Sequence, residues 1–399
     1  MATETDVHEV PTRREMIKGG STILGGGLLA GCTSDGDNPT PADGTDTATN
    51  SPPPTDSPTS YEVTIEPAGS RTFEEAPETY ASIPGAWMDI AMGFGIQPKA
   101  VAAFDRLPLK YYDALPGVDF DADAVRTLGE SAESQYDKEV FYDVDVDVHL
   151  MDPRMLKKYS GWNDEDLEEI ESNVGPILGS LIRFPFGGRD PYYTLYEAFE
   201  KAAQIFQRQA QYEAWVTLKE SFYTDIESRV PVSGDDIPTV AAFNFGFDPE
   251  SGKFFAANID APRNDTRSFR MLGVNNAFQG EEYIPFKPIG TEKLLDVDPD
   301  YIGMIGSLSY IDDTQFQKIV ETAQDHDTLS QLRAVENGNF VRTGGQYMGP
   351  IIDLFSAEAL AKQLYPEEYG EWPGSIQDVP EEEQLFDRQR VADIINGDV

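Results

Sequence analysis

Residues 192–230 read YYTLYEAFEKAAQIFQRQAQYEAWVTLKESFYTDIESRV and contain neither glycine nor proline. Asp190 and Pro191 precede this stretch and Pro231 follows it, which supplies a cap, a residue suited to the first helical turn and a terminator. We predict a helix that, if unbroken, is about 58 Å long at about 1.5 Å per residue, far longer than an average globular helix. Such a helix is better suited to connecting two bodies than to packing within one.

The apolar side chains of this stretch form two helical stripes. The stripes comprise Leu195, Phe199, Ala202 and Phe206, and then Trp215, Leu218, Phe222 and Ile226. At about 100° per residue, the step from Phe206 to Trp215 turns the second stripe to the opposite side of a continuous helix. The polar run at 207–209 lies at the switch. We therefore expect either a break there, or one helix that is buried first on one face and then on the other.

Residues 1–32 have the pattern of an export and lipidation signal. TRREMIK at 12–18 fits a twin-arginine motif, and LAGC at 29–32 fits a lipobox that makes Cys32 the lipidated residue. A short transmembrane helix with a chance cysteine is the alternative, but its apolar run is shorter than the about 20 residues that a span needs. We expect export by the twin-arginine route and a lipid anchor at the outer face of the cytoplasmic membrane.

The composition limits the classes of function. Residues 33–60 hold only small and polar types, which is typical of a disordered tether. Cys32 is the only cysteine, so no intramolecular disulfide can form. With 71 acidic and 30 basic residues the net charge is −41, which repels nucleic acid and resembles the proteins of extreme halophiles. The 40% hydrophobic content still allows a core, so we expect a folded protein without a nucleic-acid partner.

Strand and helix patterns alternate on both sides of the 192–230 stretch. Before it we predict strands at 61–65, 71–73, 78–83, 99–104 and 147–151 and helices at 88–93 and 164–173. After it we predict strands at 238–245, 254–259, 301–305 and 339–342 and helices at 268–272, 316–323 and 356–364. Alternation of this kind requires mainly parallel sheets. The predicted fold is α/β, with two three-layer lobes at 61–208 and 232–372, a linking helix at 209–231 and an acidic C-terminal tail at 373–399.

One repeated pattern supports two equivalent lobes. EVFYDVDVD at 139–147 matches EKLLDVDPD at 292–300, and each copy directly precedes an apolar strand. In so acidic a chain the match can also arise by chance. The aspartates lack the glycine and the terminal glutamate of an EF-hand loop, so a solvated turn is favoured over a calcium site.

With its elements in this order, the chain resembles the substrate-binding proteins of ABC importers for ferric siderophores and cobalamin. The resemblance covers 61–370 and rests on the exported lipoprotein start, the opening hairpin, the two glutamate segments and the late run LRAVENGNFVR at 332–342. It implies two α/β lobes joined by one long helix, with a ligand in the cleft between them. It also implies that Glu139 and Glu292 dock onto arginines of the permease. The chain departs from the family pattern in an insertion at 119–136 and a long segment at 162–189.

Candidate ligand-binding residues follow the predicted strands, because ligands bind beyond the carboxyl ends of parallel strands. They are Trp87, Arg106, Asn244, Phe245, Tyr310 and Tyr347, with Arg183 and Arg263 in nearby loops. Aromatic walls and guanidinium donors suit iron chelates that carry aromatic arms and negative charge. In so acidic a chain, unpaired arginines in the cleft would be the most telling feature.

We therefore predict a lipid-anchored, monomeric, non-enzymatic solute-binding protein that captures a ferric siderophore and delivers it to an ABC permease and its ATPase. The iron is carried inside the chelate, so no cofactor or protein-bound metal is expected. A cobalamin or haem binder of the same fold, or a surface sensor or adhesin, are the alternatives. A bare zinc or manganese site is disfavoured because only His149 and His326 follow the signal, far apart in the sequence. A hydrolase is disfavoured because its usual serine and zinc motifs are missing from the sequence.

Overall fold

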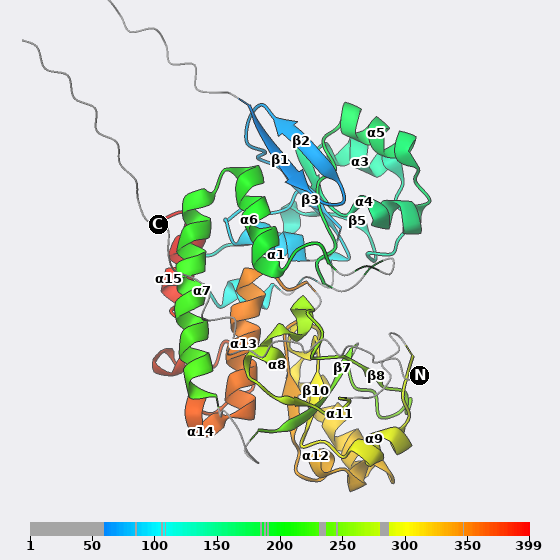
Figure 1. Cartoon of the computed structure of the whole chain (residues 1–399), viewed down its shortest axis with the longest axis vertical. Coiled ribbons are helices and arrows are strands. Elements are labelled where there is room, and N and C mark those ends of the chain that lie inside the picture. The colour runs from blue at the N-terminus through cyan, green and yellow to red at the C-terminus, as the bar shows by residue number, and fades with distance from the viewer. Residues whose placement is uncertain are drawn as a thin grey trace, which may run out of the picture. The chain divides into compact units, whose positions relative to one another are not determined.

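The structure, a computed structural model, describes residues 60–83, 86–104, 107, 109–183, 186, 189, 191–230, 237–244, 246–279, 287–345 and 347–399. The described residues all belong to one compact unit. Figure 1 shows an α/β region from the earlier part of the chain and another from the later part, beside long helices. Within the described ranges, no helix is both long and apolar enough to cross a lipid bilayer. The predicted signal, Cys32 and the tether lie outside these ranges.

A parallel sheet forms the centre of the first lobe. Its order is β5-β4-β3-β6, and the strands are β3 (Tyr80–Ser82), β4 (Ala100–Ala102), β5 (Arg126–Gly129) and β6 (Val148–Leu150). Every pairing in this sheet is parallel. Helix α1 (Ala86–Met92) joins β3 to β4, which confirms the predicted βαβ unit.

Two details of the first lobe differ from the sequence-based expectation. β1 (Tyr61–Ile65) and β2 (Gly69–Phe73) form the predicted antiparallel hairpin, but β2 begins two residues before the predicted strand at 71–73. β5 lies inside the 119–136 segment, which therefore supplies an edge strand of the sheet and is not only an inserted loop. Leu128 is the one buried residue of β5, so this strand has no apolar pattern to detect.

A mainly parallel sheet also forms the centre of the second lobe. Its strands are β7 (Thr239–Asn244), β8 (Phe255–Ala256), β9 (Asn275–Asn276), β10 (Tyr301–Met304) and β11 (Phe340–Arg342). The order is β11-β10-β7-β8, with β9 also paired to β7. β8 is antiparallel and the other pairings are parallel. The predicted α/β fold with mainly parallel sheets in two lobes is confirmed.

Helices and short turns cover both sheets. In the first lobe they are α2 (Lys110–Asp113), the 3₁₀ turn η3 (Ala122–Ala124), α3 (Lys138–Val144), α4 (Pro153–Met155), the π-helical turn η4 (Leu156–Ser160) and α5 (Asp164–Asn173). In the second lobe they are η5 (Asn264–Thr266), α8 (Arg267–Met271), α9 (Thr291–Val297), α10 (Ser307–Tyr310), α11 (Asp313–Asp325), η6 (Leu329–Gln331) and α12 (Arg333–Glu336).

The predicted connector is two helices, α6 (Leu195–Phe206) and α7 (Gln209–Arg229). Gln207 adopts a left-handed conformation with φ of 52°, which ends α6, so the first of the two expected alternatives is the one observed. α6 begins later than predicted, because Thr194 and Glu197 form a capping box there. Asp190, the predicted cap, lies outside the described residues.

A long helix that follows the second sheet runs beside α7. This helix, α13 (Pro350–Leu364), is buried along its whole length except at Gln363, and it contacts α1, α2 and α6 of the first lobe and α8 of the second. It extends the predicted 356–364 helix by almost two turns towards its N-terminus. The two lobes are thus linked by packed helices as well as by the chain connection.

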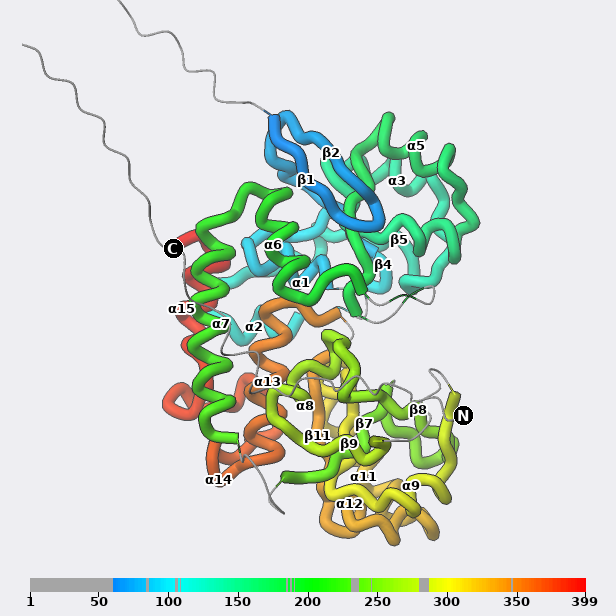
Figure 2. The backbone as a smooth tube through the Cα atoms, in the orientation of Figure 1, coloured from blue at the N-terminus to red at the C-terminus, as the bar shows by residue number. Residues whose placement is uncertain are grey.

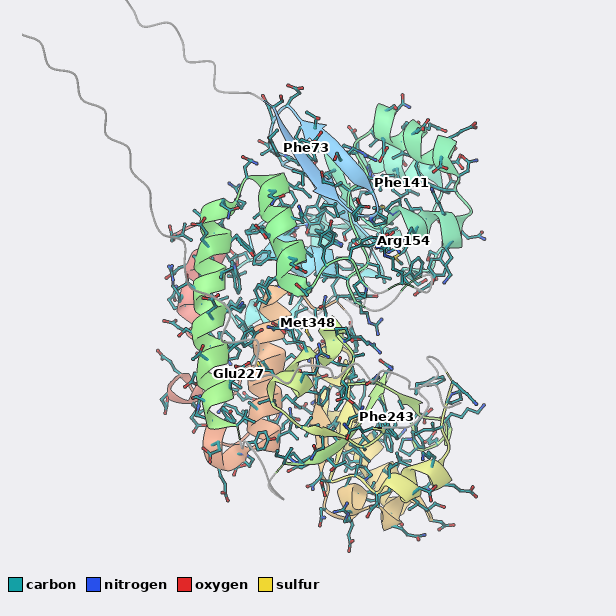
Figure 3. All side chains as sticks on the ribbon, in the orientation of Figure 1. Phe73, Phe141, Arg154, Glu227, Phe243 and Met348 are labelled. Carbon is teal, nitrogen blue, oxygen red and sulfur yellow. The ribbon has the colours of Figure 1, made fainter. Side chains whose placement is uncertain are left out.

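The cores of the two lobes are not separate. One apolar cluster runs along α1, α6, α7 and α13 and includes Tyr80 of β3 and Val240 of β7. The opposite face of each sheet has a cluster of its own, around Phe141 in the first lobe and Phe243 in the second. Both phenylalanines are labelled in Figure 3. Each sheet is therefore covered on both faces, and the shared cluster fixes one lobe against the other.

The C-terminal segment 373–399 is packed against this helical core and is not the peripheral acidic tail that its charge suggests. After α14 (Pro366–Tyr369) and the turn η7 (Glu381–Glu383), helix α15 (Arg388–Asn396) lies along α7, as Figure 2 shows. Gln211 of α7 donates to the backbone carbonyl of Ile394, and Arg388 forms a buried ion pair with Glu358 at 2.9 Å. The apolar positions of α15 outweigh the acidic composition around them.

The repeated aspartate pattern has the same structure in both lobes. Asp145 ends α3 and Asp298 ends α9, each in a left-handed conformation. Two residues later, Asp147 accepts the backbone N–H of Thr79 and Asp300 that of Thr239, at the start of the first parallel strand of each lobe. The repeat therefore forms a helix end followed by an aspartate that binds the backbone of a neighbouring strand. The interpretation as a solvated turn does not include this hydrogen bond between strands.

A buried carboxyl of the first lobe caps α13. Asp89 is fully buried, and its Oδ2 accepts the backbone N–H groups of Ile351 and Ile352, each at 3.1 Å. Tyr112 Oη donates to Asp89 Oδ1 at 3.0 Å. Burial raises the pKa of Asp89 to about 7, although these hydrogen bonds act to lower it.

The Asp89→Asn variant is expected to lose a pH dependence of stability that the natural chain shows. A carboxyl whose pKa is higher in the folded than in the unfolded chain destabilises the fold as it ionises, so the free energy of unfolding falls as pH rises from about 4 to about 7. The fall approaches about 1.4 kcal/mol per pH unit, and asparagine abolishes it. Urea unfolding of both proteins between these pH values measures the difference; parallel curves would contradict it.

Candidate ligand-binding site

A cavity of about 730 Å³ lies at the carboxyl ends of β7 and β10. Its described lining residues are Leu107, Gly246, Phe247, Asp248, Pro249, Glu250, Met304, Ile305, Gly306, Ser307, Ser309, Tyr310, Ile311, Gln315, Lys318, Ile319 and Thr322. Leu107 follows β4 of the first lobe, so the carboxyl ends of strands from both sheets approach the same space. Ligands of α/β proteins bind at this position, and the volume suits a small organic molecule.

The position of Tyr310 on the cavity wall is set by two glycines. A methyl group added at Gly345 would lie 2.5 Å from the Tyr310 hydroxyl oxygen, and one added at Gly306 would lie 3.0 Å from its ring. Tyr347 is buried, and its ring centre is 6.4 Å from that of Tyr310 in an edge-to-face arrangement.

The predicted ligand-binding arginines are paired with a buried aspartate. Asp265 Oδ2 accepts from Arg183 Nε at 2.9 Å and from Arg263 Nη2 at 2.7 Å, and Arg263 also donates to Asn244 Oδ1 at 3.0 Å. Burial acts to raise the pKa of Asp265, but the two guanidiniums lower it further than burial raises it, so the carboxylate stays charged. Arg183 and Arg263 are therefore not the unpaired cleft arginines that would have been the most telling feature, because both bind Asp265.

The remaining predicted ligand residues are placed differently from Tyr310. Trp87 is buried in the shared core, where its Nε1 donates to the Ser180 carbonyl at 2.6 Å. Arg106 and Phe245 lie outside the described residues. Of the eight predicted residues, Tyr310 is the one among the cavity's described lining residues. Residues such as Asp248, Lys318 and Thr322 were not predicted, because they lie on a turn and on α11 and do not directly follow a strand.

No cluster of three or more histidine, cysteine, aspartate or glutamate side chains that could hold a metal ion occurs among the described residues. His149 is fully buried in β6, and its Nδ1 lies 3.0 Å from the Gly175 carbonyl oxygen. Burial lowers the pKa of His149 to about 4, so the ring is neutral near pH 7. This residue has the surroundings of a packed core histidine.

The two glutamates of the repeated segments occupy equivalent positions. Glu139 is in the first turn of α3 and Glu292 is in the first turn of α9, and both side chains are exposed. Figure 1 shows α3 in one lobe and α9 in the other. Each lobe therefore presents one exposed carboxylate from the start of the helix that precedes its repeated aspartate segment.

Two α/β lobes with a cavity at the carboxyl ends of their strands are the arrangement of proteins that hold a small solute. The sequence model of the periplasmic binding protein family matches residues 133–347, more than half of the chain. The chain belongs to this family. No curated protein matches the sequence.

Solved structures of the same fold include binding proteins for iron-containing ligands. A periplasmic binding protein from Veillonella parvula has 21% identity and a TM-score of 0.55, and covers 78% of this chain and 98% of its own. The catecholate-siderophore binding protein VctP from Vibrio cholerae has 14% identity, a TM-score of 0.51 and coverages of 76% and 99%. A haem-binding protein, HmuT, has 13% identity, a TM-score of 0.52 and coverages of 76% and 85%. The family match confirms the resemblance to substrate-binding proteins, whose ligand is cargo and not a resident cofactor, and the solved structures show that the chain shares their fold.

Proposed function

We propose that this protein captures a ferric siderophore in the cavity at the carboxyl ends of β7 and β10 and delivers it to an ABC permease. In this proposal the chain acts outside the cytoplasm, after twin-arginine export, and is anchored by lipid on Cys32. It works as a monomer and catalyses no reaction. The alternatives are a cobalamin or haem as the ligand, or a sensor or adhesin without transport.

The observation that carries the proposal is the cavity of about 730 Å³ in a chain of this family. Its wall combines apolar groups such as Ile305 and Ile319 with Tyr310 and the polar groups Gln315 and Ser309. An apolar wall with a few polar groups suits the organic shell of a chelate, in which the iron's coordination sites are already filled. The absence of a metal-binding cluster among the described residues fits a chelate better than a bare cation.

Calorimetric titration tests the choice of ligand. The chain, in concentrated salt that screens its net charge of −41, is titrated with a ferric hydroxamate, a ferric catecholate, cobalamin and haem. We expect saturable binding of at least one ferric chelate with a stoichiometry of one per chain. Binding of cobalamin or haem alone would select the alternative ligand, and binding of none would favour a sensor or adhesin.

The paired Glu139→Ala and Glu292→Ala substitutions are expected to impair uptake and leave capture unchanged. Both side chains are exposed, and neither lines the cavity, so the chelate affinity should stay within about twofold of the natural protein. The double substitution removes the two carboxylates proposed to bind arginines of the permease. Iron uptake by cells is therefore expected to fall about tenfold or more. Glu227→Ala, at an exposed position of α7 labelled in Figure 3, is the control. Normal uptake by the double variant would remove the docking role.

A further inference from the structure

Three cations and three aromatic rings form a cluster in the first lobe that sequence patterns do not reveal. It comprises Arg154, Lys158, Arg189, Tyr159, Phe186 and Tyr192, here called the cationic cluster. The Lys158 Nζ lies 4.7 Å from the ring centre of Phe186 and 4.8 Å from that of Tyr159. The Arg154 guanidinium lies 5.3 Å from the ring centres of Phe186 and Tyr192. Both cations therefore share the buried Phe186 ring.

The cationic cluster has an excess of positive charge in a strongly acidic chain. Asp152 pairs with Arg154 at 2.6 Å and also accepts the backbone N–H of Leu181, so it is fully engaged and buried. Lys158 and Arg189 are exposed and contact aromatic rings, and neither forms an ion pair with any residue that the structure describes. Three cations thus face one carboxylate. A cation held over rings keeps its outward N–H groups for another acceptor.

The cationic cluster is placed at the carboxyl end of the first sheet. β6 ends at Leu150, and α4 and η4, which carry Arg154 and Lys158, follow at once. The carboxyl ends of the two sheets lie towards each other, because Leu107 beyond β4 lines the cavity of the second lobe and Arg183 reaches Asp265 there. Figure 3 places Arg154 on the side of the first lobe that is nearer the second.

The groups beyond the carboxyl ends of the two sheets differ in charge. The described wall of the cavity in the second lobe carries two carboxylates, Asp248 and Glu250, and one ammonium, Lys318. The first lobe presents the cationic cluster. A ligand held between them would place its anionic part on the first lobe, where guanidinium and ammonium groups can bind phenolate or carboxylate oxygens and aryl groups can stack on Tyr159 and Tyr192.

We infer that the cationic cluster recognises the anionic aryl groups of the ligand, so the chain selects ferric catecholates over uncharged ferric hydroxamates. This inference rests on the proposed function and adds the chemical class of the cargo. It assigns the selection to residues of the first lobe, whereas the cavity of the second lobe holds the remainder of the chelate.

Affinities for two probes test this assignment. The probes are the ferric complexes of a hexadentate tris(catecholate), which is anionic, and of a hexadentate tris(hydroxamate), which is uncharged. We expect the natural chain to bind the catecholate more tightly. Lys158→Ala should weaken catecholate binding about tenfold and Lys158→Glu more, while hydroxamate binding changes less than about twofold. Raising the salt concentration should weaken catecholate binding selectively.

Lys157→Ala provides the matched control. Lys157 is the preceding residue of the same turn, is exposed, and pairs with Asp164 at 2.5 Å away from the aromatic rings. The Lys157→Ala variant should bind both probes with the affinities of the natural chain. Equal loss in the Lys157 and Lys158 variants, or tighter binding of the hydroxamate by the natural chain, would overturn the inference and leave the proposed function standing. If the natural chain binds neither probe, both the inference and the proposed function are contradicted.

Discussion

Replacing Asp265 by alanine is expected to lower the free energy of unfolding by about 3–5 kcal/mol, because the substitution removes the buried carboxylate that the guanidiniums of Arg183 and Arg263 both contact. The side chain of Asp265 is 1% exposed, and those of Arg183 and Arg263 are 14% and 9% exposed. Urea unfolding at high salt measures the change.

Arg183→Ala is the control for this prediction. It removes the cation of the first lobe but leaves Asp265 bound to Arg263 Nε at 3.0 Å and to its Nη2. We expect it to cost about 1–2 kcal/mol, clearly less than the loss of Asp265. If Asp265→Ala unfolds within about 1 kcal/mol of the natural chain, the aspartate is not the shared counter-ion that the geometry indicates.

The Gly345→Ala variant is expected to bind the chelate about thirtyfold more weakly, equivalent to about 2 kcal/mol, while it remains folded. A methyl group at Gly345 would overlap the Tyr310 hydroxyl and the adjoining ring carbons. The ring must therefore move relative to the cavity wall. We expect the stability cost to be about 1 kcal/mol, because the hydroxyl end of a side chain can shift.

Gly290→Ala tests whether the effect depends on the site. A methyl group at Gly290 meets no atom within 4 Å, and neither Gly290 nor Gly345 has a positive φ, so both accept alanine without backbone strain. Titration with the chelate that binds the natural chain should show a loss for Gly345→Ala only. An unchanged affinity in both variants would show that Tyr310 does not contact the ligand.

Much of the fold follows from local patterns that need no tertiary information. The glycine- and proline-free stretch at 192–230 predicts the connector, and the change of apolar face predicts either a break near 207–209 or a change of buried face, of which the break is observed. The start of α6 can also be found in the sequence, because Thr194 and Glu197 have the spacing of a capping box. The prediction instead placed the helix start at Asp190 and Pro191, which also have the residue types of a helix start. Short edge strands such as β5 escaped because they bury too few side chains to show a period.

The shared core and the position of α15 depend on contacts between distant segments. Composition marks 373–399 as acidic, but the apolar face of α15 is completed by α7, which precedes it by more than 150 residues. Burial of the apolar face of α15 determines where this helix packs, and the acidic side chains remain at the surface. No local pattern shows which helix will cover it.

The candidate site was predicted only in part, for a reason of electrostatics. The rule that ligands bind beyond strand ends selected Tyr310 correctly as a wall of the cavity, but it cannot show which arginines are neutralised. Arg183 and Asp265 are 82 residues apart, and their pairing appears only in three dimensions. The same rule does not select Lys158, for which we infer a role in ligand recognition, because its side chain is carried by a helical turn several residues beyond β6.

Iron retained after gel filtration tests the central claim most directly. The natural chain and a Thr322→Trp variant are each mixed with the ferric chelate, separated from unbound chelate in concentrated salt, and analysed for iron per chain. Thr322 is partly buried on α11 and lines the cavity, so the indole fills space that the chelate would occupy. We predict close to one iron per natural chain and almost none in the variant. Iron absent from the natural chain, or retained equally by both, would contradict capture of the chelate in this cavity.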